Sequence, residues 1–146
     1  NIQILEGARA LDLGAAPGGW THYLSKQGVF VDAVDPANLS EDVLKLKNVK
    51  HYKMTAQEFA ANNSFSQYDI MVNDMKMDTN QSVNIVCEMS EQLRKGGICL
   101  MTLKLPKNGI MKRINIARKV LGRKFETVKI RQLYYNRSEV TVCAIK

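Results

Sequence analysis

Short apolar runs alternate along the chain with segments whose apolar residues recur every three or four positions. The runs are typical of buried strands, and the segments between them are typical of helices that pack one face onto a sheet. The expected strands span residues 9–13, 29–34, 49–53, 68–72, 98–103, 125–133 and 140–145. The expected helices span residues 18–26, 40–47, 55–61, 82–95 and 108–121, the fourth ending at Gly96-Gly97.

Strands that alternate with helices at this spacing predict a parallel sheet covered by crossover helices, an α/β fold. Only residues 134–139 separate the last two strands, which is too short for a helical crossover. We therefore expect a mostly parallel, seven-stranded sheet with a C-terminal antiparallel hairpin. That ending is typical of the class I methyltransferase form of the Rossmann-like fold, and a plain dinucleotide-binding domain does not need it.

Length and composition fit one folded unit. A chain of 146 residues with 45% hydrophobic residues predicts a single domain over residues 1–146, and the start at Asn1 leaves open that it belongs to a longer protein. We find no apolar run long enough to span a membrane and no signal peptide, so we expect no membrane partner and a cytoplasmic location. Cys87, Cys99 and Cys143 lack the spacing of zinc ligands, so no metal is expected.

The charge is unevenly distributed. Residues 1–103 contain nine lysines and arginines against twelve acids, whereas residues 104–146 contain twelve against two. Such asymmetry is typical of a face that binds a polyanion such as RNA. A solvated basic helix without a partner is the alternative.

The turn after the first strand, residues 12–21, reads DLGAAPGGWT. Open α/β sheets bind ligands at the carboxyl ends of their strands, and small residues let a ligand approach the backbone there. Pro17 removes a donor from a phosphate-binding turn, so a pyrophosphate fits less well than an amino acid joined to a nucleoside. We expect Asp12 to serve the ammonium group of such a ligand. Three glycines make room for it: Gly14, Gly18 and Gly19.

Asp35 ends the second strand, about twenty residues beyond this turn, where an acid typically binds ribose hydroxyls. A turn formed by Asp35 before Pro36 is the alternative. Asp32 lies in the same strand, short of its tip, and is the poorer candidate.

Three charged residues stand at the ends of expected strands. Asp74 follows the fourth strand, Lys104 follows the fifth, and Glu139 opens the last. Because the last strand is expected to be antiparallel, its start lies at the sheet edge where the other strands end, so the three side chains can converge. Charges inside apolar runs are costly unless they are paired or functional. A structural ion pair is the alternative for any one of them.

The turn at residues 12–21 resembles the first motif of the FtsJ-type ribose 2′-O-methyltransferases, DLGAAPGGWS, and the likeness covers most of the chain. Residues 102–106, 131–135 and 137–142 resemble bacterial enzymes that methylate a cytidine ribose in large-subunit ribosomal RNA. The resemblance implies S-adenosylmethionine as cofactor and ribosomal RNA as partner. It implies cofactor contacts at Gly18, Trp20, Asp35 and Asp74.

Two features depart from this family. Many members have an acid for the adenine amine after the third strand, where this chain has Met54-Thr55-Ala56-Gln57, so Thr55, Gln57 or a backbone group must substitute. The family's catalytic tetrad is Lys-Asp-Lys-Glu. Its first lysine lies upstream of the glycine turn, where this chain has nothing basic before Arg9.

The other members of the tetrad match Asp74, Lys104 and Glu139. The resemblance implies methyl transfer. From the chemistry of these residue types, we hypothesise that Lys104 takes or guides the hydroxyl proton, Glu139 holds Lys104, and Asp74 orients the reacting groups. A lysine amine accepts a proton near neutral pH only when burial or a neighbouring cation lowers its pKa.

Basic and aromatic residues follow Lys104 in the chain. We expect some of them to contact RNA phosphates or to stack on an unpaired base. Packing of Tyr134 and Tyr135 in the hairpin turn is the alternative. The RNA-binding candidates are Lys107, Lys112, Arg113, Arg131, Tyr134 and Arg137.

Other function classes remain. A nicotinamide-dependent oxidoreductase needs a GxGxxG turn, which is missing. An amino-methylating enzyme more often has a DPPY-like run where this chain has residues 73–76. A non-catalytic module that binds S-adenosylmethionine or RNA accounts for the missing first lysine, and an mRNA cap is a further ribose substrate.

Overall fold

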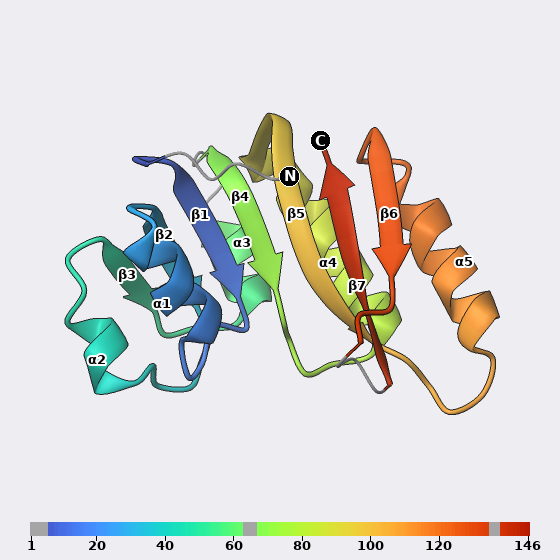
Figure 1. The fold of residues 1–146 in the computed structure, drawn as a ribbon, viewed down its shortest axis with the longest axis horizontal. Coiled ribbons are helices and arrows are strands. Elements are labelled where there is room, and N and C mark those ends of the chain that lie inside the picture. The colour runs from blue at the N-terminus through green and yellow to red at the C-terminus, as the bar shows by residue number, and fades with distance from the viewer. Residues whose placement is uncertain (1–5, 63–66, 135–137) are drawn as a thin grey trace.

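The computed structural model describes residues 6–62, 67–134 and 138–146 of the chain. Within them lies a seven-stranded sheet with the strand order β3-β2-β1-β4-β5-β7-β6 (Figure 1). Strands β1 to β5 are parallel, and β7 runs antiparallel to both β5 and β6. This arrangement confirms the predicted α/β fold and its hairpin. The strands are β1 (Arg9–Leu13), β2 (Phe30–Val34), β3 (Val49–Tyr52), β4 (Tyr68–Asn73), β5 (Leu93–Lys104), β6 (Thr127–Arg131) and β7 (Glu139–Ile145).

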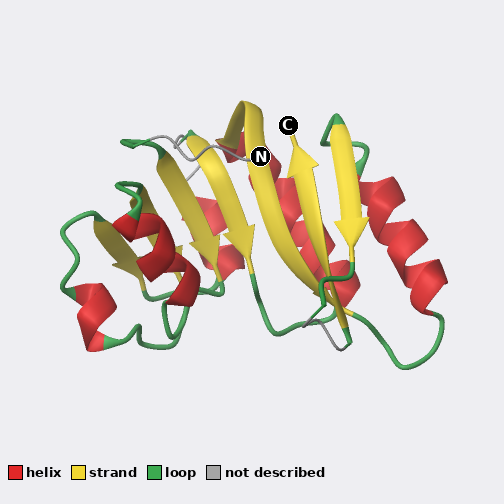
Figure 2. Cartoon of the chain, viewed as in Figure 1, coloured by secondary structure: helices red, strands yellow, loops and turns green. Residues whose placement is uncertain are grey.

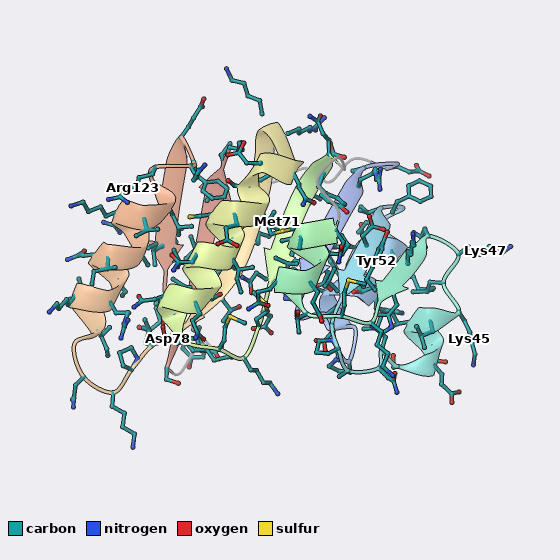
Figure 3. The ribbon with its side chains drawn as sticks, turned by 180° about the vertical axis from the view of Figure 1, so that it is seen from behind. Lys45, Lys47, Tyr52, Met71, Asp78 and Arg123 are labelled. Carbon is teal, nitrogen blue, oxygen red and sulfur yellow. The ribbon has the colours of Figure 1, made fainter. Side chains whose placement is uncertain are left out.

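Helices cover the two faces of the sheet unequally (Figures 1 and 2). Leu24 of α1 and Val43 of α2 pack on one face, against Val31 and Val72. The other face carries α3, α4 and α5 and the larger apolar cluster, which includes Met71 (Figure 3). The helices are α1 (Gly19–Lys26), α2 (Glu41–Leu44), α3 (Ala56–Asn62), α4 (Thr79–Met89) and α5 (Ile110–Leu121).

The predicted helix over residues 82–95 is wrong at both ends. Helix α4 begins three residues earlier, because Asp78 caps it by accepting a hydrogen bond from the backbone N–H of Asn80 (2.8 Å; Figure 3). It ends at Met89, a short 3₁₀ turn follows, and β5 already begins at Leu93, which pairs with Tyr68 of β4.

The glycines expected at the end of that helix lie instead inside β5. The N–H of Gly96 donates to the carbonyl of Lys146 (2.7 Å), and the N–H of Lys146 donates to Gly97 (2.9 Å). Backbone pairing with distant segments therefore overrides the local helical pattern of residues 90–97. Smaller differences occur at α2, which ends at Leu44, and at β6, which is shorter than expected.

The carboxyl ends of β1, β2, β4 and β5 meet at one edge of the sheet, and β7 begins there. The strand order reverses between β1 and β4, which is where ligands of such sheets bind. The register pairs Lys104 at the end of β5 with Glu139 at the start of β7, so both residues lie at this edge. None of the helices in the described ranges is both long and apolar enough to cross a membrane.

Candidate functional site

The turn between β1 and α1 packs closely against its neighbours, and two glycines make this packing possible. Gly14 has φ +76°, and a Cβ there would lie 2.9 Å from the backbone of Met75. Gly18 has φ +117°, and its Cβ would meet the side chain of Val43 at 2.8 Å. Both positions combine a left-handed backbone with close contact, so a side chain would displace the turn. A Cβ on Gly19 meets no protein atom within 4 Å, so this glycine borders open space.

Two cavities flank the turn. One of about 620 Å³ is lined by Gly19, Trp20 and Tyr23 of α1 and by Asp74. Trp20 is 40% exposed, so it is not a residue of the buried core. The other cavity, of about 210 Å³, lies between the ends of β1, β2 and β4. Its walls include Gly14, Asp35, Thr55, Gln57, Met75 and Met77.

Asp35 organises the loops of the smaller cavity. Its carboxylate accepts hydrogen bonds from the N–H groups of Ala16 (3.0 Å) and Ala37 (2.7 Å), one to each oxygen. The turn-forming role weighed from the sequence is therefore real. A carboxylate has about four acceptor positions, so contact with a ribose hydroxyl remains sterically and chemically open.

Asp12 lies buried beneath α1. One of its oxygens accepts a hydrogen bond from the hydroxyl of Thr21 (2.5 Å), and the other is buried without a partner among the described residues. Burial raises the pKa of Asp12 to about 6, the Thr21 hydrogen bonds oppose this rise, and the negative charges of Asp74 and Asp35 add to it. The site thus holds an acid whose ionised form is only partly compensated, by Thr21.

Lys104 is fixed at the end of β5. Its ammonium lies 2.7 Å from a carboxylate oxygen of Glu139, and both side chains are about one third exposed (35% and 33%). The hydroxyl of Thr79, at the start of α4, donates a hydrogen bond to the backbone carbonyl of Lys104. The next N–H, of Leu105, donates to Ser138 (2.9 Å). Contacts from the start of β7 and from α4 thus hold the ion pair in place. The pair itself remains open to solvent.

Asp74 lies between the glycine turn and the Lys104–Glu139 pair, because β4 is the strand between β1 and β5. Its N–H donates to the carbonyl of Leu13 (3.1 Å), and its side chain is exposed. The buried side chain of Asn73 accepts from the N–H of Met75 (3.0 Å) and donates to Ser82 (3.1 Å). These bonds fix the chain on both sides of Asp74.

The described RNA-binding candidates lie near the same edge, some along the loop and helix that follow Lys104 and others at and after the end of β6. Lys112 and Arg113 line a cavity of about 330 Å³ at the start of α5, and Lys107 is exposed beside it. Arg131 ends β6, and Tyr134 is 96% exposed rather than packed in the hairpin. Arg137 and Tyr135 lie outside the described residues.

Sequence reasoning assigned no role to Tyr23, Asn73 or Thr79. A signal for Tyr23 exists, since it stands three residues after Trp20 in a helix and shares its face. Asn73 precedes Asp74 directly, but its bonds to Met75 and Ser82 require the fold. Thr79 is distant in sequence from the Lys104 carbonyl that it binds, so no local pattern could have found that bond.

Comparison with known proteins agrees with this architecture. Two curated relatives are named ribosomal RNA large subunit methyltransferase M: that of Alteromonas mediterranea is 31% identical over 96% of the chain, and that of Xanthomonas campestris pv. campestris is 36% identical over 96%. The chain spans about two fifths of these relatives' own length (39% and 40%). Fibrillarin in the fibrillarin/Nop5p complex superposes with a TM-score of 0.79 at 20% identity, covering 100% of this chain and 76% of that one. The family model described as FtsJ-like methyltransferase matches residues 1–144, and the chain therefore belongs to the FtsJ-like methyltransferase family.

Proposed function

We propose that this chain is the catalytic domain of an RNA methyltransferase that transfers the methyl group of S-adenosylmethionine to a ribose 2′-hydroxyl, with large-subunit ribosomal RNA as the substrate class. The observation that carries the proposal is the Lys104–Glu139 ion pair, at the same sheet edge as the glycine turn and Asp74. Membership of the FtsJ-like family supports methyl transfer, and the names of the curated relatives support ribosomal RNA.

The residues of the two cavities fit this cofactor. The smaller cavity offers Asp35 to ribose hydroxyls and Thr55 and Gln57 to an adenine ring. Asp12 lines neither cavity, but its buried carboxylate, with one oxygen unpartnered among the described residues, favours a cationic ligand nearby, and the open space at Gly19 leaves room for one. When bound, S-adenosylmethionine supplies an electrophilic methyl group.

Side chains of this protein carry out the other steps of the reaction. Lys104 takes or guides the proton of the attacking hydroxyl, while Glu139 holds its ammonium at 2.7 Å. Asp74, exposed beside the larger cavity, orients the reacting groups.

Arg9 does not replace the first lysine of the family's catalytic tetrad. It opens β1, at the edge opposite Lys104, and its guanidinium pairs with Asp32 (3.2 Å).

The test is substitution of Lys104→Ala, followed by two measurements. Transfer of tritiated methyl to ribosomal RNA should fall by about 100-fold or more, as expected on loss of a general base. Calorimetry should give a dissociation constant for S-adenosylmethionine within about twofold of wild type. Lys47→Ala is the matched control, because Lys47 is exposed before β3, at the opposite edge (Figure 3), and should change neither value.

Three results would contradict the proposal. Methyl transfer that survives Lys104→Ala removes Lys104 from the mechanism. A wild-type chain that binds a nicotinamide dinucleotide in preference to S-adenosylmethionine excludes the assigned cofactor. Binding of S-adenosylmethionine and RNA by a wild-type chain without any transfer would identify the non-catalytic module considered from the sequence.

A further inference from the structure

Helix α1 presents two large aromatic side chains away from the sheet. Trp20 and Tyr23 stand three residues apart and so share one face of the helix. They are 40% and 52% exposed, whereas the residues that α1 buries are Thr21, Leu24 and Ser25. Neither ring belongs to the apolar clusters of the core. The fold therefore does not require aromatic side chains at these two positions.

Both rings border the cavity of about 620 Å³, together with Gly19 and Asp74. Asp74 is a member of the proposed catalytic set, so a ligand lying on the rings also lies beside that set. An apolar peptide in this cavity would bury the Asp74 carboxylate without a partner, which is costly. A planar ring with polar edges suits the site better, because it can stack on an aromatic face while its edges stay hydrated.

A basic residue lies next to Tyr23 on the helix surface. Lys26 follows Tyr23 by three residues, ends α1 and is exposed. An aromatic pair next to a lysine matches the two parts of a nucleotide, the base and the phosphate. The candidate contacts on α5 and β6 offer mainly cations, which recognise the backbone of RNA but not its bases.

We propose that Trp20 and Tyr23 form a stacking platform for an unpaired nucleobase of the RNA substrate, next to Asp74. This proposal rests on the proposed function, because it takes RNA as the substrate. It adds a base-binding site on α1 to the basic surface near α5. The acceptor strand is then held from two sides, by stacking at α1 and by charge at α5.

The test compares two RNA ligands that differ only in their bases: a cytidylate decamer and an abasic ribose-phosphate decamer of the same length. Binding is measured by fluorescence anisotropy with saturating S-adenosylmethionine. Tyr23→Ala should weaken binding of the cytidylate decamer about tenfold and leave binding of the abasic decamer within about twofold. Tyr23→Phe keeps the ring and should bind both decamers nearly as wild type does.

Phe30→Ala is the matched control, because Phe30 is a comparably exposed aromatic residue (55%) at the start of β2, on the opposite edge of the sheet. It should change neither affinity. The fluorescence of Trp20 gives an independent measurement of base binding, because Trp20 is the chain's single tryptophan. Its fluorescence should be quenched by the cytidylate decamer and not by the abasic one.

Equal weakening of both decamers by Tyr23→Ala, or no weakening of either, would overturn the stacking platform while leaving the proposed function intact. Failure of the wild-type chain to bind either decamer would count against RNA as the substrate, and the platform would fall with it.

Discussion

The buried carboxyl group of Asp12 makes the stability of the fold depend on pH in a way that one substitution can isolate. Its pKa is about 6 in the folded chain, against an ordinary value of 3.8 for an aspartate carboxyl. Burial is the main cause, and the nearby charges of Asp74 and Asp35 contribute. Because the folded pKa lies above the unfolded one, the folded chain binds more protons than the unfolded chain between these two values.

The sign and size of the effect follow from this difference. The stabilisation from protonated Asp12 is fully present below about pH 4 and is lost as the pH rises through 6. Each pKa unit corresponds to about 1.4 kcal/mol, so ionised Asp12 costs the fold about 3 kcal/mol at neutral pH. The second oxygen gives this cost a structural basis, because it has no hydrogen-bond partner among the described residues and only the first accepts the bond from the Thr21 hydroxyl.

Asp12→Asn is the informative perturbation, since asparagine can still accept the Thr21 hydrogen bond but cannot ionise. Its buried amide donors add a cost of about 1–3 kcal/mol that does not vary with pH. The free energy of unfolding of the variant, relative to wild type, should therefore rise by about 2 kcal/mol between pH 4.5 and 7.

Urea denaturation at half-unit pH steps measures this difference, and titrations shared by both proteins cancel. Asp42→Asn is the control, because the Asp42 side chain is 94% exposed and its substitution should shift stability little at any pH. A difference between Asp12→Asn and wild type that stays constant from pH 4.5 to 7 would refute the reasoning. With saturating S-adenosylmethionine the pH dependence should shrink, because a cationic ligand compensates the ionised carboxylate.

Two further substitution experiments follow from the site. Gly14→Ala should destabilise the fold by about 2–4 kcal/mol in thermal or urea denaturation, because its Cβ meets the Met75 backbone in a left-handed conformation. Gly19→Ala should keep wild-type stability, since its Cβ meets no protein atom, yet weaken S-adenosylmethionine binding about tenfold in calorimetry; unchanged affinity would place the cofactor elsewhere. Replacing Lys112 and Arg113 by alanine should lower the slope of log affinity for single-stranded RNA against log salt by about 1.4, and an unchanged slope would exclude both as phosphate contacts.

The order of apolar runs was enough to predict the sheet, because the central strands β1 and β4 are buried along most of their length and read as continuous apolar runs. The short connection before β7 was enough to predict the hairpin. Together these two features predicted that Lys104 and Glu139 lie at the same edge of the sheet. The observed register pairs these two residues. This part of the site was predictable because strand direction alone decides which ends meet.

Residues 90–97 resisted prediction for a different reason. Their apolar spacing continues the pattern of α4, but their backbone groups pair with β4 and with Lys146. A local pattern contains no information on such partners. The same holds for Asp35, whose two hydrogen bonds come from Ala16 and Ala37, and for Asp12, whose raised pKa depends on burial and on two acids from other strands.

The uneven charge along the chain becomes a spatial separation because of the strand order. Strands β1 to β4 fill one half of the sheet, and the acids Asp12, Asp35 and Asp74 stand at or just beyond their carboxyl ends. Strands β5 to β7 with α5 fill the other half, where lysines and arginines far outnumber acids. A cationic cofactor and a polyanionic RNA therefore prefer different halves of the same edge, and Lys104 ends the strand at the boundary. Under the proposed function, this separation keeps most RNA phosphates away from the acids that hold the cofactor, except at the nucleotide bound on α1. It also brings the ribose hydroxyl to the boundary between the two halves.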